Sequence, residues 1–313
     1  MIILHFSREE DSMFDVLGLY AFYGLGITLN KAAMNYAQPL FFLGVRLLLS
    51  SSVLLGYLYF FKHQDIKVER KHISLFAQSA LMLYSGFAFG FWALHHMNTS
   101  KNALFFTLTP FITAFLVYVL YGDKLTMKQI CGLVIGFVGV LPALLVKADP
   151  SLNSSLTLIG LPEIAAIIAI AAGAYGWILA NTLIRKHAYS PFFINALNMA
   201  ICGALLLATT WVMNVHNEPY YLEWQPFIAY VLVLCVVNDI VTYNLYMVLL
   251  KKYSTTFLAF AGFLVPLYVA FYSWVWLGEV VTWHFFASLF IIFWGLYLFY
   301  RGEQSKRAII SHK

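Results

Sequence analysis

The chain has 313 residues, of which 62% are hydrophobic and only 11% are charged. Soluble domains contain about 45–50% apolar and about 25% charged residues, so this composition excludes an ordinary soluble protein and indicates an integral membrane protein. The net charge of +5 is better explained by basic loops that orient a membrane chain than by binding to nucleic acid, and we expect no nucleic-acid partner.

Apolar segments long enough to cross a bilayer follow one another along the whole chain. About 20 helical residues span the hydrocarbon layer. The runs lack the strict alternation of a β-barrel strand, and spanning segments must satisfy their own backbone hydrogen bonds, so helices are expected. We therefore predict an all-α fold with ten transmembrane helices, at residues 14–34, 40–61, 73–96, 100–121, 127–146, 162–184, 191–213, 226–250, 254–277 and 283–300.

The first half of the sequence is repeated in the second half. One constant shift in numbering brings Pro110 onto Pro266 and Asp123 onto Glu279, and such self-similarity indicates a duplicated architecture. The same shift aligns Ser100 with Thr256, Gly122 with Gly278, Thr126 with Thr282 and Gly139 with Gly295. We predict a single domain over residues 1–313, built from the repeat halves 14–146 and 162–301.

Basic residues collect in alternate loops, which sets the orientation of the chain by the positive-inside rule. Lys124 and Lys128 follow the fourth predicted span, and Arg185 and Lys186 follow the sixth. Both termini are then cytoplasmic, and because each half has five spans, the second half is inserted upside down relative to the first. Inverted repeats of this kind are typical of secondary transporters with a substrate site near the bilayer midplane.

Asp239, in the middle of the eighth predicted span, is the strongest single functional signal. An ionisable group at membrane depth normally faces a cavity or a partner. Tyr243 and Tyr246 follow one and two turns later, so helical spacing places the three side chains on one stripe. The stripe either lines a substrate cavity or forms a polar contact that holds two helices together.

Arg46 lies inside the second predicted span, and its planar guanidinium could hold a carboxylate or phosphate of a substrate. Long basic side chains near helix ends also extend to the lipid headgroups, which is the alternative role. Asn198 shares a stripe with Asn195 and Cys202 that either lines the pore or packs between helices. A direct pair between Asp239 and Arg46 is one arrangement, but spacing alone does not place them together.

Aromatic residues make up 18% of the chain, and many of them lie on predicted helix stripes. Tyrosine and tryptophan near span ends are typical of the membrane interface, whereas rings in mid-span could wall a pocket for a cationic or ring-bearing substrate. The further aromatic candidates for the substrate site are Tyr23, Trp92, Tyr175, Trp177 and Tyr272.

The repeated proline and acidic positions are expected to have structural roles. Pro110 and Pro266 fall inside predicted spans, where the missing amide donor kinks a helix. Asp123 and Glu279 fall at span ends, where a carboxylate can cap a neighbouring helix N-terminus. The sequence contains no Walker loop, no Gly-rich dinucleotide motif, no Cys/His metal spacing and no Gly-x-Ser-x-Gly motif, so we expect no enzyme activity, cofactor or metal site.

The combination of these features resembles the drug/metabolite transporter superfamily, and within it the EamA-like family with ten transmembrane helices. The resemblance covers nearly the whole chain. It rests on the glycine-rich fifth span, on Arg46, and on the repeated motifs Pro110 with Gly122-Asp123 and Pro266 with Gly278-Glu279. It implies a central cavity between spans 1–4 and 6–9, peripheral spans 5 and 10, and alternating access by rocking helical bundles, but it does not name the substrate.

These observations predict a secondary carrier of the bacterial inner membrane for a small polar metabolite. An amino acid or amino-acid-like solute is the first hypothesis, because Asp239 and Arg46 match its ammonium and carboxylate groups. A nucleotide-like or adenosyl solute such as S-adenosylmethionine, with tyrosines stacked on the base, is the alternative, and a non-transporting receptor or assembly subunit is a third hypothesis. A proton is one candidate coupling ion, with Asp239 as its site, and we expect a monomer or weak dimer.

Overall fold

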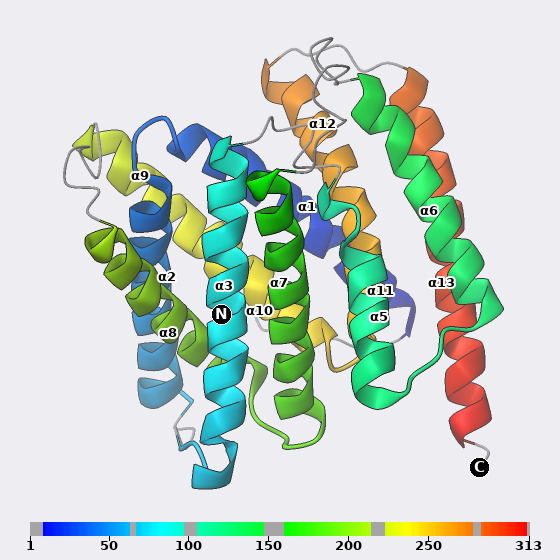
Figure 1. Ribbon diagram of the computed structural model, residues 1–313, viewed down its shortest axis with the longest axis horizontal. Helices are drawn as coiled ribbons and strands as arrows, with labels where there is room; N and C mark the ends of the chain where they lie inside the picture. The colour runs from blue at the N-terminus through cyan, green and yellow to red at the C-terminus, as the bar shows by residue number, and fades with distance from the viewer. Residues whose placement is uncertain are drawn as a thin grey trace.

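The structure is a computed structural model that describes residues 9–62, 67–96, 105–146, 160–213, 223–277 and 283–311. These residues form helices and the connections between them (Figure 1), so the expected all-α class is confirmed for the described part of the chain. The first half contains α1 (Glu9–Ala33), α2 (Pro39–Phe60), the short 3-10 helix η1 (Arg70–His72), α3 (Ile73–His96), α5 (Thr109–Tyr121) and α6 (Met127–Val146). The second half contains α7 (Leu161–Arg185), α8 (Pro191–Val212), α9 (Trp224–Leu234), the π-helix η4 (Cys235–Thr242), α10 (Tyr243–Leu249), α11 (Thr255–Ala261), the 3-10 helix η5 (Gly262–Leu264), α12 (Val265–Leu277) and α13 (Trp283–Ser311).

Several of these helices have the length and composition of membrane spans. Among the described residues, six are long and apolar enough to cross a bilayer, which needs about 20 helical residues. They extend over Pro39–Phe60, Arg70–Leu94, Leu161–Arg185, Pro191–Val212, Trp224–Leu249 and Thr255–Tyr272. The apolar helices Thr109–Tyr121 and Met127–Gly139 are shorter.

Three of the predicted segments differ from the continuous α-helices that were expected. Residues 226–250 contain the π-helical turn η4 between α9 and α10, and residues 254–277 contain the 3-10 turn η5 between α11 and α12. In the segment 100–121, α5 begins only at Thr109, and residues 97–104 lie outside the described residues. Hydropathy reports which residues are apolar but not the spacing of backbone hydrogen bonds, so it does not reveal such breaks.

The repeated prolines begin helices where kinks were expected. Pro110 is the second residue of α5, and Pro266 is the second residue of α12. Proline is well tolerated in the first helical turn, because the amide it lacks would have no acceptor within the helix. Each proline therefore follows a break in its span and restarts the helix.

The N-terminus of α6 is capped by Thr126 and Gln129. The Thr126 Oγ1 atom accepts from the Gln129 amide at 3.3 Å, and Gln129 Oε1 accepts from the Thr126 amide at 2.9 Å, which is a reciprocal capping box. Asp123, expected to cap a helix, lies exposed in the connection after Gly122, whose φ of 66° ends α5. Glu279 lies outside the described residues.

The main helix contacts join the first half of the sequence to the second half. α2 packs against α8, α3 against α7, α5 against α11 and α6 against α13, while α1 lies against both α12 and η4. In Figure 1, α6 and α13 run side by side along one edge of the molecule, and α2 and α8 lie toward the opposite side. The helices of the two halves are therefore interleaved.

α6 and α13 approach closely because glycines face each other. A Cβ atom on Gly132 would lie 2.7 Å from the carbonyl oxygen of Gly295, and a Cβ atom on Gly295 would lie 2.8 Å from the carbonyl oxygen of Gly132. Small residues at helix interfaces let backbones approach within a membrane and gain van der Waals contact. This helix pair depends on glycine at both positions, because the opposing atom is rigid backbone.

Candidate substrate site

A buried ion pair joins α2 to η4. The Nε atom of Arg46 lies 2.9 Å from Oδ2 of Asp239, and the two side chains are 1% and 0% exposed. The Arg46 side chain is therefore buried and does not extend to the headgroup region. It pairs directly with Asp239, an arrangement that sequence spacing alone does not predict. Charges removed from water are tolerated only when they are paired and hydrogen-bonded, so the surroundings of this pair decide its stability.

Three polar side chains complete the surroundings of the ion pair. Arg46 Nη1 donates to Oδ1 of Asn30 at 2.6 Å. The Ser50 hydroxyl lies 2.9 Å from Asp239 Oδ2, and Asn238 Nδ2 donates to Asp239 Oδ1 at 3.3 Å. The five side chains come from α1, α2 and η4, so a polar site lies where these three helices meet.

Local backbone structure brings these groups together. Ser50 follows Arg46 by one helical turn, so both side chains project from the same face of α2. Asp239 lies in the π-helical turn, at the end of which the Tyr243 amide donates to the Asn238 carbonyl five residues back. The extra residue in such a turn changes the direction of the side chains that follow, and π-turns within α-helices are frequent at functional sites.

Four aromatic residues, Tyr23, Trp177, Tyr243 and Tyr246, form a cluster beside the ion pair, which we name the aromatic cluster. The centroid of the Tyr23 ring lies 6.0 Å from that of Tyr243 and 6.4 Å from that of Tyr246. The Trp177 ring lies 4.6 Å from Tyr246 and 6.1 Å from Tyr243. Tyr243 follows Asp239 by four residues, about one helical turn, so the aromatic cluster adjoins the ion pair. The rings thus offer apolar, electron-rich faces next to two opposite charges.

Asn198 lies on α8 and is 2% exposed. Its Nδ2 atom donates to Ser79 Oγ at 3.2 Å, and the Ser79 hydroxyl donates to the Gly176 carbonyl at 3.2 Å. The residue after Gly176 is Trp177, so Asn198 is linked through α3 to the part of α7 that carries the aromatic cluster.

For Tyr272 and Trp92, two of the remaining predicted site residues, the structure shows contacts with groups other than the ion pair. The Tyr272 hydroxyl donates to the Ala21 carbonyl at 3.1 Å and ties α12 to α1. The Trp92 ring lies 4.3 Å from the ring of His96, at the end of α3. Tyr175 is half-buried on α7, and because it lies two residues before Trp177, it points to a different side of that helix.

Sequence reasoning missed Ser50 and Asn30. Ser50 carries a detectable signal, because a hydroxyl one turn from a membrane-embedded arginine shares its helix face. Asn30 carries none, since its place beside Arg46 depends on how α1 lies against α2 in the folded chain.

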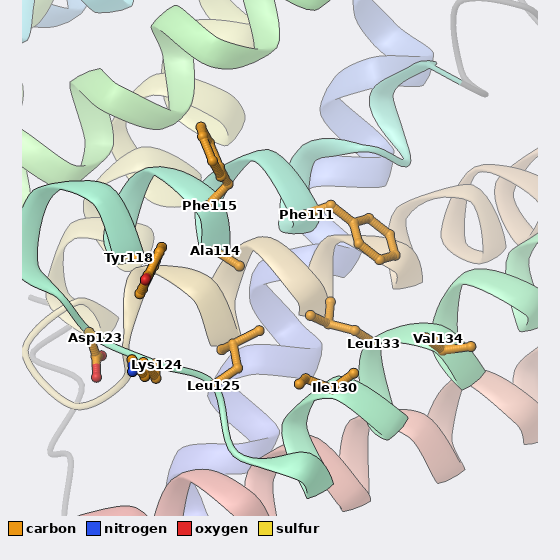
Figure 2. A pocket seen from close by; sticks show the side chains of 10 residues that line it. All are labelled: Phe111, Ala114, Phe115, Tyr118, Asp123, Lys124, Leu125, Ile130, Leu133 and Val134. Atoms are coloured by element: carbon orange, nitrogen blue, oxygen red, sulfur yellow. The ribbon is translucent and has the colours of Figure 1, made fainter.

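A separate hollow of about 360 Å³ lies between α5 and α6. Figure 2 shows apolar side chains from both helices around it, with Asp123 and Lys124 at one end. Phe115 and Val134, which line it, are 64% and 51% exposed, so it opens on the outer surface of the helices. No residue of the ion pair or of the aromatic cluster lines it, and we do not regard it as the substrate site.

Replacing Ser50 with alanine is expected to destabilise the protein by about 1.5–3 kcal/mol, because the buried carboxylate of Asp239 loses a hydrogen bond. Ser52→Ala is the matched control, since Ser52 is exposed on the same helix and its hydroxyl bonds only to the backbone, donating to the Leu48 carbonyl at 2.9 Å. Unfolding of both variants in detergent measures the difference. Equal stability of the two variants would contradict the assigned role of Ser50.

The comparison with known families places this chain among membrane transporters. A model of the EamA-like transporter family matches residues 13–145 and 161–301. The chain therefore belongs to this family, and it is a multi-pass bacterial membrane protein whose substrate is a small molecule. The family resemblance expected from the repeated proline motifs is confirmed.

Two relatives and one solved structure add detail. The S-adenosylmethionine/S-adenosylhomocysteine transporter of Chlamydia muridarum (strain MoPn / Nigg) is 31% identical, over 89% of this chain and 89% of its own length. A probable amino-acid metabolite efflux pump of Salmonella typhimurium (strain LT2) is 24% identical, over 96% of this chain and 98% of its own. A crystal structure 14% identical in sequence matches with a TM-score of 0.72, covering 93% of this chain and 97% of its own, which shows a shared fold. The relatives are transporters rather than enzymes.

Proposed function

We propose that this protein transports S-adenosylmethionine and S-adenosylhomocysteine, solutes that join an amino acid to an adenosine group. The observation that carries the proposal is the position of the aromatic cluster, through Tyr243 one turn after Asp239, beside the buried Arg46–Asp239 pair. The charged pair suits the amino-acid end of such a solute, and the rings suit its adenosine end. The Chlamydia muridarum relative, named as a transporter of both compounds, supports the same substrates.

The ion pair matches a zwitterion. The guanidinium of Arg46 offers parallel N–H donors to a carboxylate, and Asp239 accepts from an ammonium group. When an amino-acid group enters between the two side chains, the Arg46–Asp239 pair is replaced by two ion pairs, Arg46 with the carboxylate and Asp239 with the ammonium group. Neither protein charge is then left unpaired. A neutral solute at the same place would leave both charges without compensation, at a high cost in a buried site.

The aromatic cluster matches the other end of the solute. Stacking of a base on an aromatic side chain contributes about 1–3 kcal/mol. The sulfonium cation of S-adenosylmethionine is attracted to ring faces, and tryptophan has the strongest attraction of this kind. Trp177 and Tyr246, with centroids 4.6 Å apart, are the rings we assign to the adenine group.

A carrier for a simple amino acid is the second candidate function. The Arg46–Asp239 pair alone would serve such a substrate, and the Salmonella typhimurium relative, a probable amino-acid metabolite efflux pump, favours it. The two candidates differ in the aromatic cluster, which has a role in binding only if the substrate carries a ring or a second cation.

We further propose ten transmembrane spans in a 5+5 inverted repeat with both termini cytoplasmic. The contacts support this arrangement, because the packing of α3 on α7 has its counterpart, by the repeat, in the packing of η4 on α1. The two separate family matches at 13–145 and 161–301 support it as well. Reporters fused after Val146 and after Arg185 should lie on opposite sides of the membrane, and the same side for both would contradict the proposal.

Asp239 is also our candidate for proton coupling, because protonation of this buried carboxylate would release Arg46 from its partner. In proteoliposomes, Asp239→Asn separates coupling from binding. Because Asp239 is assigned to the ammonium group, the variant should lose both accumulation driven by a pH gradient and exchange of substrate across the membrane. Loss of accumulation with exchange intact would assign Asp239 to proton coupling alone and contradict its role in binding. We also propose that the protein is a monomer or weak dimer. The molecular mass of the purified protein in detergent tests this oligomeric state.

Ligand-induced stabilisation of the purified protein tests the proposed substrates. S-adenosylhomocysteine at about 100 times its Kd should stabilise the native state by about 2.7 kcal/mol. Methionine and adenosine, each carrying half of the solute, should stabilise it less at the same concentration. If methionine stabilises as strongly as S-adenosylhomocysteine, the amino-acid candidate is favoured, and if none of the three binds, the proposed substrates are wrong.

A further inference from the structure

Two buried amide side chains on α8 each have a polar atom without a partner. Among the described residues, no group makes a hydrogen bond to Nδ2 of Asn195 or to Oδ1 of Asn198, although both residues are only 2% exposed. A buried donor or acceptor that loses water and gains nothing is destabilising, and native structures rarely keep one without a reason. The two atoms therefore indicate a ligand whose polar groups form hydrogen bonds with them.

The two amides act from the same face of α8. Asn195 and Asn198 are three residues apart, so their side chains lie about one turn from each other. The Asn198 amide is fixed by its bond to Ser79, which uses Nδ2 and leaves Oδ1 available. Asn195 therefore offers a hydrogen-bond donor and Asn198 an acceptor, and together they suit a ligand edge that carries one acceptor and one donor.

This face of α8 lies next to the aromatic cluster. Cys202, one turn beyond Asn198 on the same stripe, packs in one hydrophobic cluster with Met199 and Tyr243, and Trp177 borders that cluster. Ser79, which holds the Asn198 amide, bonds to the carbonyl of Gly176, the residue before Trp177. The Asn198 amide and the rings therefore border the same region between α3, α7, α8 and α10, and Asn195 lies on the same stripe of α8 as Asn198.

We propose that Asn195 and Asn198 recognise the edge of an adenine ring that stacks on the aromatic cluster. The exocyclic amino group of adenine would donate to Asn198 Oδ1, and an adjacent ring nitrogen would accept from Asn195 Nδ2, the same donor–acceptor logic by which asparagine recognises adenine elsewhere. This inference rests on the proposed function, and it adds the residues that distinguish adenosyl solutes from those with another base.

Discrimination between two bases tests the inference. S-inosylhomocysteine carries hypoxanthine, in which a carbonyl oxygen replaces the exocyclic amino group, so it presents an acceptor to Asn198 Oδ1. The affinities of wild-type protein for S-adenosylhomocysteine and S-inosylhomocysteine are measured by titration in detergent. Because a site built for a hydrogen bond rejects a ligand that lacks it, we expect wild type to prefer the adenosyl compound at least tenfold.

The variants assign this preference to the two amides. Asn198→Leu keeps the approximate size of the side chain and removes its polar atoms, and it should bring the ratio of the two affinities close to one. Asn195→Leu is the second variant, in case Asn198→Leu does not fold, and it should reduce the preference as well. Thr210→Val is the matched control, because Thr210 is also a buried polar residue of α8 but its hydroxyl donates to the Leu206 backbone carbonyl at 2.9 Å, and this variant should retain the full preference.

The outcomes separate the inference from the proposed function. If wild type binds S-adenosylhomocysteine but does not discriminate, or if both leucine variants keep the full preference, the adenine assignment is overturned while the proposed substrates stand. If wild type binds neither compound, the proposed function is itself wrong. Loss of preference in the leucine variants but not in Thr210→Val supports the inference.

Discussion

Replacing Asp239 with asparagine is expected to destabilise the protein by about 3–5 kcal/mol, because it leaves the buried guanidinium of Arg46 without a counter-charge. Arg46→Met should cost a similar amount, since it leaves the carboxylate unpaired. Both side chains are almost inaccessible to solvent, at 1% and 0% exposure, so water cannot compensate either charge. Chemical unfolding in detergent, compared with wild type, measures the effect.

An exposed ion pair provides the control. Glu69 and Lys71 lie 2.7 Å apart, with side chains 60% and 69% exposed, and exposed pairs contribute little to stability. Glu69→Gln should therefore unfold like wild type. If Asp239→Asn is as stable as Glu69→Gln, the Arg46–Asp239 pair is hydrated in the membrane and its assigned role is wrong.

The double variant Arg46→Met with Asp239→Leu separates stability from transport. Apolar residues of similar volume often replace a buried ion pair at little cost, so this variant should recover most of the stability lost in either single variant. It should not recover binding of S-adenosylhomocysteine, because both groups assigned to the amino-acid end are absent.

The second large effect is expected at the contact between α6 and α13. Gly132→Ala places a methyl group 2.7 Å from the backbone oxygen of Gly295, so the helices must separate, and overpacking of this kind costs about 1–3 kcal/mol. Substrate affinity should change little, because neither helix contributes to the ion pair or to the aromatic cluster. Unfolding measurements combined with ligand titration check both parts of this prediction.

Gly56→Ala is the control for that experiment. Gly56 lies in α2, and a Cβ atom at this position would meet no atom within 4 Å. Alanine has a higher helix propensity than glycine, so the variant should be unchanged or more stable by about 0.5–1 kcal/mol. A loss of stability in Gly56→Ala equal to that in Gly132→Ala would show that helix packing is not the cause.

The helical class and the positions of most helices follow from hydropathy, because a lipid environment allows few backbone solutions. α2 begins at Pro39 and α8 at Pro191, each within one residue of the position that the apolar runs predict. The π-helical turn around Asp239 and the 3-10 turn before Pro266 were not predictable, since they depend on how neighbouring helices pack and not on apolar periodicity.

The candidate site was predictable in its charged residues but not in its arrangement. Asp239 and Arg46 are conspicuous because ionisable groups are costly at membrane depth. Trp92 and Tyr272 are also candidates because they are aromatic and lie in apolar segments, yet a stripe on one helix does not reveal which neighbouring helix it faces. In the structure the Trp92 ring contacts His96, and the Tyr272 hydroxyl donates to the Ala21 carbonyl of α1.

The interleaving of the two halves has a consequence for how the protein is made. Ser50 lies beside Asp239, and 189 residues separate them along the chain. At about 5–20 residues per second, the ribosome needs about 10–40 s to complete that interval. During this time Arg46 has no carboxylate to pair with. We therefore expect α2 to remain at the translocon or the membrane interface until η4 has been synthesised.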